Sequence, residues 1–203
     1  MKNLVSYIHK HNYNLASNIF YKKFPAHQRN LIIYIACSLD GYIATSDDDL
    51  HFLDRVQKEG EDYGYADFVS TVDTVILGRK TYDWVMDRVD LFPHADKETY
   101  VITRTERSRS GNVVFYTGSL KELITGLKKK PGRNIFCDGG AEIVNAILRE
   151  QLFDEIILSV IPILLGNGKR LFKNNRPEQD LDLLSVQQYD TGLVQLHYKM
   201  TDN

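Results

Sequence analysis

The strongest constraint on the fold is an alternation of short apolar runs with helical patterns that begins at Leu31. The first run covers residues 31–36, and similar runs follow at 72–77, 100–103, 113–116 and 135–137. Apolar runs this short, with few polar residues, are typical of strands that are covered on both faces. The sequence therefore predicts a mostly parallel sheet.

Helical patterns separate these runs. Residues 119–130 carry one apolar stripe, with Ser119 and Glu122 spaced as a capping box, and Pro131-Gly132 ends the pattern. A second helix is predicted over residues 141–150, whose inward-facing residues are Ile143, Val144, Ile147 and Leu148. Strands that alternate with helices predict an α/β domain with helices on both faces of the sheet.

The end of the chain has a different pattern. Residues 181–189 and 193–200 flank Asp190-Thr191-Gly192, which is a hairpin signal. In the second of these segments apolar residues alternate with Gln195, His197 and Lys199. The alternation predicts an antiparallel hairpin with one buried face.

Composition excludes several classes of protein. The chain has 203 residues, 43% of them hydrophobic and 26% charged, and a formal net charge of -2. This charge gives no general electrostatic reason to bind nucleic acid, and no apolar run is long enough to span a membrane. Cys37 and Cys137 are the only cysteines, each flanked by apolar residues. We therefore expect reduced thiols, a cytoplasmic location and no metal site.

Residues 1–29 differ from the rest of the chain. They contain five basic residues and no acidic ones, with apolar residues at loosely helical spacing. A single arginine is poor support for an organelle transit peptide. We expect a basic N-terminal arm at 1–29, in helical form and packed on its own domain or on a sister subunit, followed by one domain at 30–203.

Three junctions between a strand and a turn carry the chemical signal. The first is Gly78-Arg79-Lys80-Thr81, where an apolar strand gives way to two cations and a helix. The second is Thr103-Arg104, after the strand at residue 100. Backbone N–H groups at a helix start, together with nearby cations, suit a phosphate. A solvated basic turn is the alternative at the first junction, and the second is a weak signal by itself.

The third junction is Asp138-Gly139-Gly140-Ala141-Glu142. Two glycines between a strand and a helix let a pyrophosphate approach the backbone, although a tight turn that needs positive φ explains them equally well. The sequence is neither the G-x-G-x-x-G fingerprint nor a P-loop. Three such junctions in one domain favour a dinucleotide with an additional phosphate.

These motifs resemble the dihydrofolate-reductase-like family. The resemblance covers about residues 31–200 and rests on Ser38-Leu39-Asp40-Gly41-Tyr42-Ile43-Ala44, on the first and third junctions, and on the stretch from Pro162 to Phe172. Within that family the chain is most similar to the reductase (C-terminal) domain of the bifunctional riboflavin-biosynthesis deaminase–reductase and its stand-alone relatives. The resemblance implies an α/β, three-layer fold with a mostly parallel central sheet and an antiparallel C-terminal hairpin. No zinc-deaminase signature precedes the domain.

The resemblance implies NADPH as the cofactor. Ala36 and Ile43 match positions that hold the nicotinamide, and the remaining matches hold the phosphates, the adenosine end and the pyrophosphate. These remaining positions are Gly78, Arg79, Lys80, Thr81, Thr103, Arg104, Gly139, Gly140, Ala141 and Glu142.

Three acidic residues are candidates on the substrate side. Asp138 stands where riboflavin reductases carry an acidic residue that faces the substrate, with Asp in place of the usual Glu. Asp49 is the nearest analogue of the carboxylate that orients the pterin in dihydrofolate reductases, or else it caps a helix in a solvated loop. Asp40 is a third candidate, or a structural turn residue before Gly41.

The resemblance implies a reductase that transfers hydride from NADPH to a C=N bond. The expected substrate is a small pyrimidine, as in 5-amino-6-(5-phosphoribosylamino)uracil reductase. A pteridine reductase and a non-catalytic NADPH-binding protein are the alternatives. Family members are commonly dimers, so we expect a homodimer formed through an apolar sheet edge or through the N-terminal arm.

Overall fold

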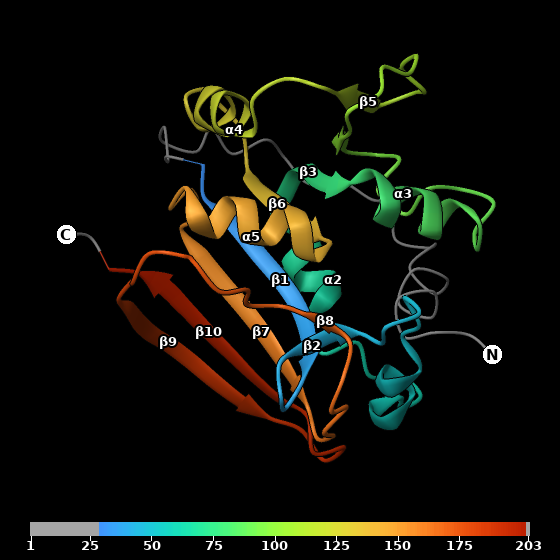
Figure 1. Cartoon of the computed structure of the whole chain (residues 1–203), viewed down its shortest axis with the longest axis vertical. Coiled ribbons are helices and arrows are strands. Elements are labelled where there is room, and N and C mark those ends of the chain that lie inside the picture. Colours follow the sequence, from blue (N-terminus) through green and yellow to red (C-terminus); the bar gives the residue numbers. More distant parts are fainter. Residues whose placement is uncertain (1–28, 202–203) are drawn as a thin grey trace, which may run out of the picture.

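A computed structural model describes residues 29–201 of the chain (Figure 1). Its largest element is an eight-stranded sheet in the order β5-β4-β3-β6-β1-β7-β10-β9. The strands of this sheet are β1 (Leu31–Ser38), β3 (Val72–Gly78), β4 (Glu98–Ile102), β5 (Val113–Tyr116), β6 (Asn134–Gly139), β7 (Glu155–Ile161), β9 (Leu181–Gln188) and β10 (Val194–Met200). A small antiparallel pair is formed by β2 (Tyr42–Ala44) and β8 (Lys169–Arg170).

The strands from β5 to β7 in this order are all parallel to their neighbours. The last two, β10 and β9, are antiparallel and form the C-terminal hairpin. The carboxyl ends of β1, β3, β4 and β6 therefore meet at one edge of the sheet, where ligands of such sheets usually bind.

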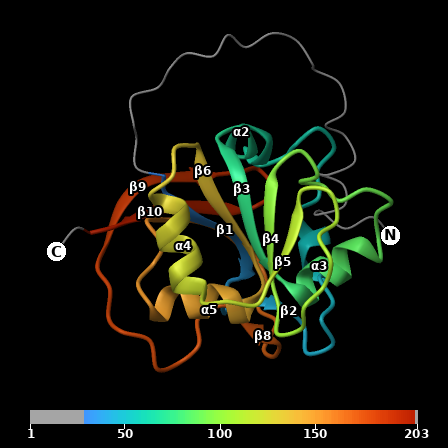
Figure 2. The ribbon, with the colours of Figure 1, turned by 90° about the horizontal axis from the view of Figure 1, so that it is seen from above.

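Helices cover both faces of the parallel strands. On one face α4 (Leu120–Lys128) and α5 (Ala141–Arg149) pack on a cluster that includes Ile33 and Cys137. On the other face α2 (Tyr65–Ser70) and α3 (Arg79–Met86) pack on a cluster around Phe136. Figure 2 shows α3 and α4 on opposite sides of β3. The predicted three-layer, dihydrofolate-reductase-like α/β fold is confirmed.

A third apolar cluster lies beside the carboxyl end of β1. It is built around the short 3-10 helix η1 (His51–Val56), from which Phe52 and Val56 are buried against Ile161 of β7. This cluster fixes the loop between β2 and α2 on the sheet. No helix among residues 29–201 is long and apolar enough to cross a membrane.

Arg29 is part of the domain core. Its side chain is 4% exposed, pairs with Asp73, donates to Thr74 Oγ1 at 2.6 Å and donates to the carbonyl oxygen of Arg133 at 2.7 Å. Of the predicted arm, residues 1–28 lie outside the described residues. The folded domain therefore includes Arg29, one residue earlier than the boundary we expected.

The C-terminal hairpin has the predicted alternation, but the face that was predicted to be buried is only partly buried. Leu196 pairs with Leu158 and Val186, on the α5 side of the sheet, and Tyr198 pairs with Leu183 on the same side. All of β9 is nevertheless exposed, and the apolar residues of β10 are only half-buried. The reason is that α5 covers β6 and β1, and no described helix packs over β10 and β9.

Candidate functional site

Two of the predicted turns touch each other at the edge of the sheet. A Cβ atom placed on Gly78 would lie 3.2 Å from Ile143 Cγ1 and 3.8 Å from the nitrogen of Gly140. A Cβ atom on Gly140 would lie 3.0 Å from Thr81 Oγ1. The preceding Gly139 has φ +94°, which disfavours other residues, and its peptide bond to Gly140 is cis. Side chains at these glycines would therefore fill the place where the turns meet.

The two turns also flank a change in the direction of the chain. From β3 the chain passes through α3 to β4, away from β6, while from β6 it passes through α5 to β7, away from β3. The strands β3 and β6 are neighbours, and their helices leave on opposite faces. Such a switch point opens a crevice between neighbouring turns, which is where open α/β sheets bind ligands.

Both helices begin in this crevice with backbone donors available. Gly78 is the N-cap of α3 and Gly140 is the N-cap of α5, and neither helix has a side-chain cap among the described residues. In contrast, the Ser119 side chain accepts from the Glu122 N–H at the start of α4. Because the first N–H groups of a helix have no partner within it, the two uncapped starts offer donors to an anion.

Arginines lie next to the first turn. Arg79 Nη1 lies 2.5 Å from Asp83 Oδ2 and Arg107 Nη1 lies 3.0 Å from Asp83 Oδ1, so one carboxylate holds two guanidinium groups on the outer side of α3. Arg107 follows the second predicted turn in the loop after β4, and sequence reasoning missed it. One basic residue in an irregular loop gives no periodic signal.

The second turn is a compact loop. The Thr103 side chain accepts from the Thr105 N–H at 3.1 Å and is buried, whereas Arg104 is exposed. Because β4 is the neighbour of β3, this turn lies beside the first one. All three predicted turns therefore lie at the same edge of the sheet.

Glu142 lies between cations at the start of α5. Its carboxylate pairs with Lys173, and this contact, with further attraction from Lys80, lowers its pKa. The side chain is 84% exposed. Ala141 is the first residue of the same helix.

The two predicted nicotinamide contacts lie near the end of β1. Ala36 is half-buried on β1 and packs against the η1 cluster. Ile43 is half-buried on β2 and packs against the cluster on the α5 face. The two residues thus flank β1 where it runs into the turn at residues 39–41.

Asp138 is the predicted acidic residue with the most unusual surroundings. It lies near the end of β6, on the face of the sheet that α2 covers, and its side chain is 26% exposed. Its Oδ2 atom lies 3.8 Å from Nε2 of His94, which is 2% exposed. The Tyr65 hydroxyl lies 3.4 Å from the same Nε2 atom. No sequence motif indicated His94 or Tyr65, because His94 lies in the irregular loop between α3 and β4.

Asp40 is held by the protein itself. Its carboxylate accepts from Ser38 Oγ at 2.6 Å, from the Leu165 N–H at 3.0 Å and from the Gly166 N–H at 2.7 Å. These hydrogen bonds, with that from Ser38 the largest effect, lower its pKa to about 2. The contacts tie the loop at 162–168 to the turn after β1, which is the structural role considered as the alternative.

Asp49 lies in an exposed turn before η1. Its carboxylate accepts from the His51 N–H at 2.5 Å, and this bond is the main reason that its pKa is lowered. Its side chain is 60% exposed. Within residues 29–201 it makes no hydrogen bond or ion pair with Asp138 or with the three turns.

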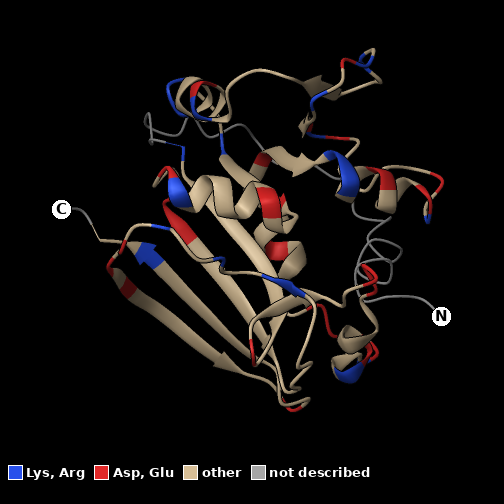
Figure 3. Cartoon of the chain, in the orientation of Figure 1, with Lys and Arg blue, Asp and Glu red and all other residues tan. Residues whose placement is uncertain are grey.

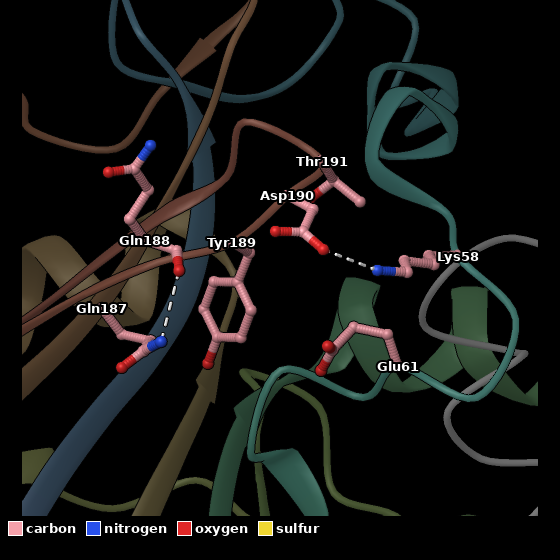
Figure 4. A pocket seen from close by; sticks show the side chains of 7 residues that line it. All are labelled: Lys58, Glu61, Gln187, Gln188, Tyr189, Asp190 and Thr191. Atoms are coloured by element: carbon pink, nitrogen blue, oxygen red, sulfur yellow. Dashed lines mark hydrogen bonds and ion pairs between the residues drawn. The ribbon is translucent and has the colours of Figure 1, made fainter.

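Two cavities lie away from the three turns. One, of about 270 Å³, is lined by seven residues including Tyr189 and the ion pair of Lys58 with Asp190 (Figure 4). The other, of about 280 Å³, is mainly apolar and lies between α5 and the hairpin, with Phe172 and Tyr198 in its wall. Neither is lined by a residue of the three turns.

Comparison with known proteins identifies the family of the chain. The RibD C-terminal domain family matches residues 29–195. The chain is 43% identical over 172 residues to the uncharacterized protein YwjB of Bacillus subtilis (strain 168), covering 84% of this chain and 98% of that protein. It is 29% identical to YyaP of the same strain, over 84% of this chain and 95% of YyaP.

Solved structures show the same fold. A protein from Shewanella sp. PV-4, whose name assigns it to riboflavin biosynthesis, superposes with a TM-score of 0.77 at 28% identity, over 85% of this chain and 99% of that one. Dihydrofolate reductase from Enterococcus faecalis in complex with NADP(H) superposes with a TM-score of 0.62 at 16% identity, over 86% and 98% of the two chains. By its sequence and its fold, this chain belongs to the RibD C-terminal domain family.

Proposed function

We propose that this protein is an NADPH-dependent reductase that transfers hydride to a C=N bond of a small heterocycle. Family membership supports a reductase of the riboflavin-pathway type. The observation that carries the proposal is that the glycine turns after β3 and β6 touch each other at the edge of the sheet. The most similar activity is reduction of 5-amino-6-(5-phosphoribosylamino)uracil, which is the reductase activity named for a structural neighbour from Thermotoga maritima.

The residues at the crevice fit a dinucleotide phosphate. Gly78 and Gly140 leave room for a pyrophosphate against the backbone, and the uncapped starts of α3 and α5 supply N–H donors. Arg79 and Lys80, with Arg107 beside them, supply positive charge for a 2′-phosphate. Thr81, Thr103, Arg104, Ala141 and Glu142 complete this proposed set, while Ala36 and Ile43 are proposed to border the nicotinamide.

On the substrate side we assign Asp138 as the group that contacts the heterocycle. When NADPH is bound it supplies the hydride, and the reduced nitrogen takes one proton from a protein group or from water. A half-buried carboxylate at the edge of the crevice can accept hydrogen bonds from ring N–H and amino groups and so orient the C=N bond. The three hydrogen bonds of Asp40 and the exposure of Asp49 make Asp138 the strongest of the three acidic candidates.

Turnover tests this function directly. Purified protein is mixed with NADPH and either the ribosylaminopyrimidine or a dihydropteridine, and NADPH oxidation and product formation are followed. The proposal predicts turnover of the pyrimidine. Turnover of the pteridine alone would identify a pteridine reductase instead. NADPH binding without any turnover would favour a non-catalytic protein.

We further propose that the protein is a homodimer that assembles through the hairpin. Leu183 and Val186 of β9 are 54% and 53% exposed on the apolar side of the hairpin. Apart from one charged residue near one end of each strand, β9 and β10 are uncharged (Figure 3). Such an apolar edge strand is a surface that soluble proteins usually cover.

A cytoplasmic location is the last part of the proposal. Cys37 and Cys137 are buried and free, and burial raises the pKa of their thiols to about 11 and about 12. Buried, protonated thiols are typical of proteins that work in a reducing compartment.

A further inference from the structure

A buried histidine lies behind the carboxylate that we place against the substrate. Nε2 of His94 faces Asp138 Oδ2 at 3.8 Å. The His94 side chain is 2% exposed, whereas that of Asp138 is 26% exposed. Asp138 is therefore the outer member of the pair and the one that a ligand can reach.

The position of His94 is fixed by packing and by the backbone. Its ring lies edge-on to Phe92 and Phe136, with centroids 5.6 Å and 5.7 Å away. Its carbonyl oxygen accepts from the Lys97 N–H at 2.9 Å, which closes the turn that follows. The imidazole thus has little freedom to move away from Asp138.

Tyr65 lies close to the same nitrogen. Its hydroxyl lies 3.4 Å from Nε2, so that Nε2 is near both a phenol and a carboxylate. Burial raises the pKa of Tyr65 well above its ordinary value, and the phenol therefore remains neutral. Within residues 29–201, the negatively charged group that faces Nε2 is Asp138.

The distance between His94 and Asp138 has a chemical meaning. At 3.8 Å the two atoms are beyond hydrogen-bond range, which ends at about 3.2 Å, so the Asp138 side chain has to rotate towards Nε2 for the bond to form. Hydrogen bonds in active sites are often long in the free enzyme and shorten in the complex. An aromatic, water-poor environment strengthens the bond once it forms.

We infer that His94 is a positioning residue for Asp138: Nε2 donates to Oδ2 and so holds the carboxylate in the orientation in which its outer oxygen accepts from the substrate. The inference rests on the proposed function, because it gives Asp138 its role. It adds a residue for which the sequence motifs give no indication. No proton transfer through His94 is required, since the bond acts on orientation.

Two variants separate positioning from packing. His94→Phe keeps an aromatic ring among Phe92 and Phe136 but removes the donor, while His94→Gln places an amide N–H near the position of Nε2. We expect kcat to fall about tenfold to hundredfold in H94F, the value of a hydrogen bond to a charged group, and H94Q to recover part of it. The Kd for NADPH should stay near that of the wild type in both variants.

The matched control is His197→Phe. His197 also pairs with a carboxylate, that of Glu155 at 2.7 Å, but on the polar face of the hairpin. H197F should leave kcat unchanged. An equal fall in kcat in H94F and H94Q would make His94 a packing residue and overturn the inference. A rise in KM for NADPH with kcat unchanged would do the same.

A second readout does not depend on turnover. In protein labelled with ¹⁵N at histidine, Asp138→Asn should shift the Nε2 resonance of His94 and leave that of His197 in place. An unchanged His94 resonance would overturn the contact itself. A shifted resonance in a protein that reduces no imine would instead refute the proposed function while leaving the pair intact.

Discussion

At the scale of single residues, the acidic candidates differ in what holds them. Asp40 is bound by Ser38 and by two backbone N–H groups, while Asp138 faces a buried imidazole and keeps part of its surface open. The sequence motif located both residues, because each lies where a strand runs into a turn. It could not distinguish their roles, since the partners of each carboxylate come from distant parts of the chain.

Asp138→Asn tests the assignment on the substrate side. The amide has nearly the same size but lacks the negative charge and one of the two acceptor oxygens, so we expect turnover to fall by roughly a hundredfold, the value of a hydrogen bond to a charged group. Cofactor affinity should remain near wild type, because the phosphate turns are untouched. Steady-state kinetics and an NADPH titration measure the two effects separately, and unaltered turnover would make Asp138 a structural residue.

Asp40 should make stability depend on pH in the acid range. Its pKa is lowered from 3.8 to about 2, so its contribution to stability is complete above pH 3.8 and is lost as the pH falls through about 2. Urea unfolding from about pH 5 to about pH 2 should therefore show that the free energy of unfolding falls more steeply in the wild type than in Asp40→Asn. Asp47→Asn, in the exposed turn that follows β2, is the control, and an equal slope in all three proteins would contradict this role.

At the scale of elements, the sequence predicted those parts that local patterns determine. The start of α4 follows the predicted cap at Ser119, and β5 has the predicted bounds. The strand expected at 100–103 instead covers Glu98–Ile102, because Thr99 is buried and pairs with Val75 of β3.

Asn145 is buried on α5, where its side chain donates to the Leu171 carbonyl oxygen at 2.7 Å. Long-range partners of this kind leave no local pattern.

The strand pair β2–β8 depends on a single glycine. Gly168 has φ +146°, and a Cβ there would lie 2.2 Å from the Ala44 carbonyl oxygen. Gly168→Ala should therefore lower the free energy of unfolding by more than about 1 kcal/mol. Gly126→Ala is the matched control, because Gly126 lies in α4 with open space around its Cα and should gain up to about 1 kcal/mol. Chemical denaturation of both variants measures the difference, and a neutral G168A would show that the loop can move away.

At the scale of the whole molecule, the α/β pattern predicted the layers and the sheet, but not what the hairpin packs on. An alternating strand predicts one apolar and one polar face, and the polar face is as expected: Gln195 donates to Tyr34 Oη at 2.9 Å and Lys199 pairs with Asp182 at 3.5 Å. Burial of the apolar face depends on another body packing over it. That information is not contained in the pattern of one strand.

Assembly through the hairpin can be tested with two neighbouring positions on β9. Leu183→Asp places a charge on the apolar face, whereas Ser185→Asp places one on the opposite face, beside His197. We expect L183D to be monomeric and S185D to remain dimeric in sedimentation equilibrium, because burying an unpaired carboxylate opposes association. Dimers in both variants would exclude this face as the interface, and a monomeric wild type would exclude the homodimer.

The central claim is that the turns after β3 and β6 form a site for NADPH, and equilibrium titration of the full chain with NADPH and NADH tests it most directly. The account predicts binding of NADPH with marked preference over NADH, and loss of that preference in the Arg79→Ala/Lys80→Ala double variant. Lys129→Ala/Lys130→Ala, which removes two exposed cations after α4, should keep the preference. Absence of binding, or equal affinity for the two nucleotides in the wild type, would contradict the account.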